Sequence, residues 1–113
     1  MKINGIELEF DYMESETNKR FERAAKSVSK KANDVENIKK LSEKIDTLCY
    51  AVKECFDVIF GVGTGVEVCG KENNLIKCMH ALNELMKEKC RQDKVLSGET
   101  REFMEFLKNG ISD

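Results

Sequence analysis

A run of apolar residues at alternating intervals of three and four constrains the fold of this chain more than any other feature. The run comprises Ile38, Leu41, Ile45, Leu48, Val52, Cys55 and Ile59. Such spacing places the side chains on one face of an α-helix and is typical of a seam that packs against a second helix. We therefore predict a long helix over residues 34–60. The pair Asn33–Asp34 supplies residue types that commonly start a helix.

Two occupants fit this seam. We favour the preceding segment of the same chain, which would form a helical hairpin with residues 34–60. The alternative is an intermolecular coiled coil, and the same seam then leads us to expect a homo-oligomer. If the seam is filled by a helix of another protein or by a second copy, the partner-binding residues are the four at its narrow end: Ile38, Leu41, Ile45 and Leu48.

The rest of the chain predicts a mainly α fold in a single domain of 113 residues. Residues 1–12 alternate apolar and polar side chains around Asn4–Gly5, a pair that favours a two-residue hairpin turn. We expect an N-terminal β-hairpin there, followed by a helical bundle of about four helices plus one short helix at a glycine-rich corner. The expected helices span residues 15–32, 34–60, 64–69, 74–90 and 98–109.

The glycine-rich corner reads FGVGTGVEVCG from Phe60 to Gly70. Loops that bind phosphate need a strand before the glycines, whereas a long helix precedes them here. We predict instead that Gly61 ends that helix and that Thr64 and Glu67 form a capping box that starts the short helix. The residues assigned to the corner are Phe60, Gly61, Gly63, Thr64, Glu67 and Gly70.

The residue types that carry catalysis are sparse. His80 is the only histidine, and we expect it on the exposed side of its helix, on a different face from Cys78. No catalytic, metal-binding or cofactor-binding set can be assembled around one histidine, so we expect a protein that is not an enzyme. Five cysteines without a CxxC pair predict free thiols in a cytoplasmic protein, and no apolar run has transmembrane length.

The charges are unevenly distributed, although the net charge is only −2. Residues 19–44 carry nine basic and four acidic side chains. Such a block contacts an acidic partner or nucleic acid in some proteins, but it is more often a solvated helix face. The acidic balance of the whole chain and the lack of interleaved aromatic residues argue against nucleic acid. The candidate residues for that use are Lys19, Arg20, Arg23, Lys26, Lys30 and Lys31.

The stretch around the corner resembles an uncharacterised family of small phage and prophage proteins of Gram-positive bacteria. That family carries an F-D-x-x-F-G-x-G-T element, then a short helix ending in glycine, then an N-L-x-x-C helix start. The matching residues here are Phe56, Asp57, Phe60, Gly61, Gly63, Thr64, Gly70, Asn74, Leu75 and Cys78. The resemblance covers about residues 1–90, and it departs at Cys69, where a phenylalanine is expected.

Proteins of this kind look like the tail assembly chaperones of long-tailed phages. The resemblance therefore implies a non-enzymatic protein in the cytoplasm of the host bacterium, bound to a helical tape-measure or tail protein. A phage anti-defence protein that inhibits a host protein is the alternative, because it would share the same small, non-catalytic character. Because no apolar run has transmembrane length, we expect no membrane partner.

Overall fold

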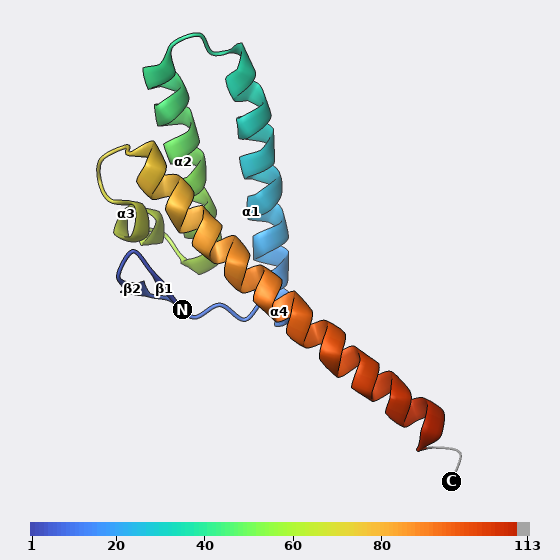
Figure 1. Cartoon of the computed structure of the whole chain (residues 1–113). Coiled ribbons are helices and arrows are strands. Elements are labelled where there is room, and N and C mark those ends of the chain that lie inside the picture. The colour runs from blue at the N-terminus through green and yellow to red at the C-terminus, as the bar shows by residue number, and fades with distance from the viewer. Residues whose placement is uncertain (111–113) are drawn as a thin grey trace.

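The computed structural model describes residues 1–110 and confirms a mainly α fold that opens with a small β-hairpin. In chain order the elements are β1 (Lys2–Ile3), β2 (Ile6–Glu7), α1 (Ser15–Asp34), the 3₁₀ turn η1 (Val35–Asn37), α2 (Leu41–Phe60), α3 (Thr64–Cys69) and α4 (Leu75–Asn109). Helices α1 and α2 lie side by side, and α4 crosses them and continues alone beyond the body of the molecule (Figure 1). This free extension accounts for a longest dimension of 67 Å.

The N-terminal hairpin forms as the Asn4–Gly5 turn predicts. Both residues have positive φ, 49° and 85°, and Ile3 pairs with Ile6 across the turn. The turn docks on the body because the Asn4 side-chain amide donates to the Val68 carbonyl at 2.7 Å. The chain then continues in an extended conformation, and Phe10 is buried. The side chain of Gln92 on α4 holds the backbone of this extended segment, and we call this contact the Gln92 clamp. Gln92 donates to the Phe10 carbonyl and accepts from the Tyr12 amide.

Helices α1 and α2 form the helical hairpin that we favoured, so the chain itself fills the deep half of the seam. The predicted start of the long helix at residue 34 is wrong. Helix α1 runs through Asp34 into η1, and residues 38–40 then form the connection that reverses the chain direction before α2 begins at Leu41. Ile38 has the extended backbone of that connection, with φ −91° and ψ 128°. Ile38 matches the heptad spacing in the sequence, but it does not lie on the face of a helix.

A single 35-residue helix, α4, replaces the two helices predicted at 74–90 and 98–109. It begins as expected, with Asn74 accepting from the Lys77 amide. It does not stop near residue 90, because ion pairs at i,i+3 and i,i+4 (Glu88–Arg91 and Lys89–Asp93) span the expected break. The Ser97 hydroxyl donates to the Asp93 carbonyl within the helix and starts no new one. One glycine, Gly98, costs about 1 kcal/mol relative to alanine, too little to end a helix without proline.

The core lies where α2, α3 and the first half of α4 meet α1 and the hairpin. Phe56 is fully buried and stacks on Phe60, whose ring lies 5.9 Å from that of Phe10. Phe10 in turn contacts Phe21 of α1. The aromatic rings thus connect the extended segment after the hairpin, α1 and the end of α2, and they hold the corner against the rest of the fold.

Candidate protein-interaction surfaces

Asp57 organises the glycine-rich corner. Its backbone carbonyl accepts from the Gly61 amide, and its Oδ1 atom accepts from the amides of Gly63 (3.1 Å) and Gly65 (2.8 Å). Gly61 and Gly63 have φ of 117° and 98°, which side-chain-bearing residues rarely adopt. A carboxylate already occupies the amides that a phosphate would need, so the corner is structural, as predicted.

The predicted capping box is wrong, although the bounds of the short helix are right. Thr64 is the first residue of α3, and the Glu67 amide donates to the Gly63 carbonyl. The Asp57 carboxylate, six residues upstream of Gly63, does the capping that we assigned to Thr64 and Glu67. Gly70, with φ 86°, ends the helix as expected.

Gly65 marks a close approach that sequence reasoning missed. It is buried where α3 lies against α2, and a Cβ atom added there would fall onto the Lys53 carbonyl oxygen and 2.6 Å from the Lys53 Cα. Only glycine fits such a contact between backbones. A glycine inside a predicted helix was the available signal, because helices otherwise disfavour that residue.

The four residues predicted to bind a partner do not share one free helix face. Ile38 lies in the connection before α2, and Ile45 packs against the core cluster. Leu48 is half-buried, and Leu41 alone is largely exposed, at 68%. The deep half of the seam (Val52, Cys55 and Ile59) is buried inside the chain. The seam therefore offers one exposed leucine at the tip of the hairpin and no continuous docking surface.

The second half of α4 presents the apolar surface that the seam lacks. We call residues 95–109 the free half of α4, because this part of the helix extends away from the body (Figure 1). Its large apolar side chains are exposed between 38% and 65%. They are Val95, Leu96, Phe103, Met104, Phe106 and Leu107. The spacing of Phe103, Phe106 and Leu107 indicates one helix face, and the structure shows that this face is exposed.

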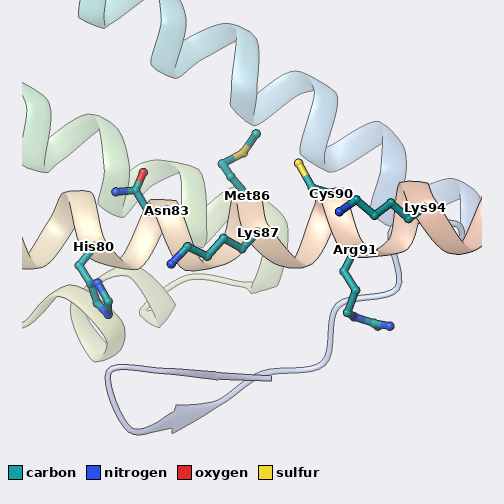
Figure 2. Close-up of a pocket in the computed structure, with 7 residues that line it drawn as sticks. All are labelled: His80, Asn83, Met86, Lys87, Cys90, Arg91 and Lys94. Atoms are coloured by element: carbon teal, nitrogen blue, oxygen red, sulfur yellow. The ribbon is translucent and has the colours of Figure 1, made fainter.

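The first half of α4 carries a shallow, basic groove on its outer side (Figure 2). His80 is exposed there, as predicted, and points to the opposite side of α4 from Met86 and Cys90. His80 and Cys90 are ten residues apart, about 15 Å along a helix, so they form no nucleophilic pair. Two of the basic side chains are neutralised by neighbours, since Lys87 pairs with Glu84 and Arg91 with Glu88.

Three buried thiols meet in the core where α2, α3 and α4 converge. Cys49, Cys69 and Cys78 are each at most 1% exposed, and Cys78 lies near both of the other thiols. Burial raises the pKa of Cys49 to about 11, and it does the same for Cys55 beside Phe56. All five cysteines are free, as predicted, and only Cys90 is exposed. Within residues 1–110, no group of histidine, cysteine and acidic side chains has the geometry to hold a metal ion.

Some of the basic side chains of residues 19–44 form ion pairs, and others are exposed to solvent. Lys31 pairs with Glu54 at 3.0 Å and lies over the Tyr50 ring, so it joins α1 to α2. Lys19 pairs with Glu16. Arg20, Arg23, Lys26 and Lys30 are exposed on α1, as a solvated face would be.

Comparison with known proteins gave one match. Residues 4–109 match a family of unknown function, DUF6673, over nearly the whole chain. The chain belongs to this family. No curated protein and no solved structure matched the chain. The DUF6673 match extends through the free half of α4, the part for which we had found no resemblance. No helix within residues 1–110 has both the length and the apolar composition needed to cross a membrane.

Proposed function

We propose that this protein is a non-enzymatic assembly chaperone of phage tails that binds a helical tape-measure or tail protein. The observation that carries the proposal is the exposed apolar face on the free half of α4. An isolated helix of about 15 residues is marginal in water, and packing of its apolar face normally stabilises it. A helix laid along that face would give the free half of α4 the same kind of contact that α2 and α3 give the first half.

Coexpression tests this proposal. The chain is produced with tape-measure and tail-tube proteins of long-tailed phages of Gram-positive bacteria, and complexes are isolated by a tag on the chain. We expect one of these proteins to copurify with the full chain and to be lost, by at least tenfold, when residues 95–113 are deleted. The deletion spares the body, because the free half of α4 packs on no other element.

Two results would contradict the proposal. In the first, none of the tail proteins binds the full chain; capture of a host nuclease instead would then favour the anti-defence alternative. In the second, a tail protein binds the deleted chain as well as the full one, and the binding surface then lies elsewhere. As a matched control, Gly98→Ala keeps every apolar side chain and strengthens the helix, so binding should be retained.

A further inference from the structure

One carboxylate, that of Glu99, lies inside the apolar face of the free half of α4. The surface neighbours of a helical residue are those three and four positions away, and three of the four around Glu99 are large and apolar. They are Val95, Leu96 and Phe103, and the fourth is Glu102. Glu99 is exposed, and no ion pair within residues 1–110 involves it. A helix that covers this apolar face must therefore also cover a carboxylate that has no partner.

Polar side chains on the same side of α4 do have partners where the body covers them. Gln92 precedes Glu99 by seven residues, just under two turns, so the two lie on nearly the same side of the helix. The Gln92 clamp holds the backbone of the extended segment. Lys89 pairs with Asp93 and lies over the ring of Tyr12. Because a polar group that is covered without a partner is costly, whatever covers Glu99 must offer it a donor as well.

A second copy of the chain has no positive charge to place there. The basic side chains of the free half, Arg101 and Lys108, lie about 140° and about 120° around the helix from Leu96, outside the apolar face. A parallel copy would place Glu99 beside its own counterpart. An antiparallel copy would place it against the apolar side chains of the other free half. Each arrangement takes the carboxylate out of water without an opposite charge, which is strongly destabilising.

We infer that the occupant of this face is an amphipathic helix of another protein that carries one basic side chain within its own apolar face, opposite Glu99. Its apolar side chains pack against Leu96 and Phe103, and its basic side chain forms an enclosed ion pair with Glu99. Arginine suits this position better than lysine, because its planar guanidinium can bind both carboxylate oxygens. The pair also fixes the register of the two helices, as a single polar residue does within the seam of a coiled coil. The inference rests on the proposed function in taking the partner to be a helix that lies on this face.

Two designed peptides test the inference on the full chain. Each is an amphipathic helix of about three heptads with leucine at the seam. The peptides differ at one central seam position, where one carries arginine and the other glutamate. We expect the arginine peptide to bind about tenfold tighter by calorimetry, because only its side chain neutralises Glu99. Light scattering of the chain alone should give the mass of a monomer, 12.9 kDa.

The variant Glu99→Lys should reverse this preference, so that the glutamate peptide binds the tighter of the two. Glu105→Lys is the matched control, because it makes the same change of charge about 180° around the helix from Leu96 and should leave the preference intact. Both sites are exposed on the free half of α4, so the fold should persist, with an unchanged unfolding midpoint as its measure. If Glu99 only supported the helix, its replacement would change the affinity for both peptides without reversing their order.

The inference is overturned by equal binding of the two peptides, by binding of neither, or by a preference that Glu99→Lys leaves in place. Loss of the preference in Glu105→Lys would also overturn it, because the charge of the helix as a whole would then be its cause. A stable dimer that Phe103→Ser converts to monomer would make a second copy the occupant and would exclude the inference too. Copurification of a tail protein that needs residues 95–113 but persists in Glu99→Lys would overturn the inference and leave the proposed function standing, so the two fail separately.

Discussion

Replacing Gly65 with alanine should loosen the packing of α3 on α2. The added Cβ would sit 2.6 Å from the Lys53 Cα and 2.7 Å from its carbonyl carbon, whereas ordinary contacts begin near 3.4 Å. Both obstacles are backbone, so no side-chain rotation relieves the overlap, and the two helices must separate by about 1 Å. Val68 and Cys69, the buried side chains of α3, would lose contacts in the process. Overpacking of this kind costs about 1–3 kcal/mol, and we place Gly65→Ala at about 2–3 kcal/mol.

Urea and thermal denaturation followed by circular dichroism measure this loss. For a chain of this size, 2 kcal/mol corresponds to a fall of about 8 °C in the unfolding midpoint. Gly98→Ala is the matched control, because a Cβ there meets nothing within 4 Å and the site lies inside a helix. It should increase helicity and leave the midpoint unchanged or raised. A neutral or stabilising Gly65→Ala would refute the close approach of α3 to α2.

Three further measurements probe the corner, the thiols and the deep core. Asp57→Ala removes the acceptor of the Gly63 and Gly65 amides and should lower the free energy of unfolding by about 1–3 kcal/mol, with a smaller loss for Asp57→Asn, whose Oδ1 can still accept. At neutral pH, a thiol reagent should modify only Cys90 rapidly, and the other four cysteines should react only as the chain unfolds; rapid reaction of a second thiol would contradict their burial. The pKa values of Cys49 and Cys55 are raised to about 11 in the folded chain, so the folded state holds these protons more tightly than the unfolded state does. Their contribution to stability is therefore complete below about pH 9 and is lost between pH 9 and 11, which denaturation midpoints across that range will show.

Local signals were enough to predict the parts of the fold that depend on a few consecutive residues. Asn4–Gly5 gave the turn because both positions require positive φ. The Asn74 side chain starts α4 because its Oδ1 atom accepts a hydrogen bond from the backbone amide of Lys77. Gly61 and Gly70 end helices because they adopt a backbone that other residues avoid.

Features that depend on contacts between residues distant in the sequence could not be predicted from it. Asp57 caps a helix that begins seven residues after it, a reach that no capping motif encodes. The apolar spacing continues from Ile38 to Leu41, although residues 38–40 form a connection and not a helix. Sequence spacing alone therefore could not reveal that the chain reverses direction there. Phe103 and Phe106 show the opposite kind of error, because side chains that the spacing predicts to be buried are exposed. Their spacing predicts a buried face, and only the three-dimensional arrangement shows that nothing in the chain covers it.

Five of the six fixed positions of the F-D-x-x-F-G-x-G-T element have a structural role, and these roles separate fold from function. Phe56 and Phe60 stack in the core, and Asp57 holds the amides of the turn. Gly61 and Gly63 supply positive φ. These five positions therefore each have a structural cause, so another chain with this element should share the corner whatever it binds. Information on the partner must come from surfaces that the fold does not need. The free half of α4 is such a surface, because its exposed apolar face has no role in the body of the molecule.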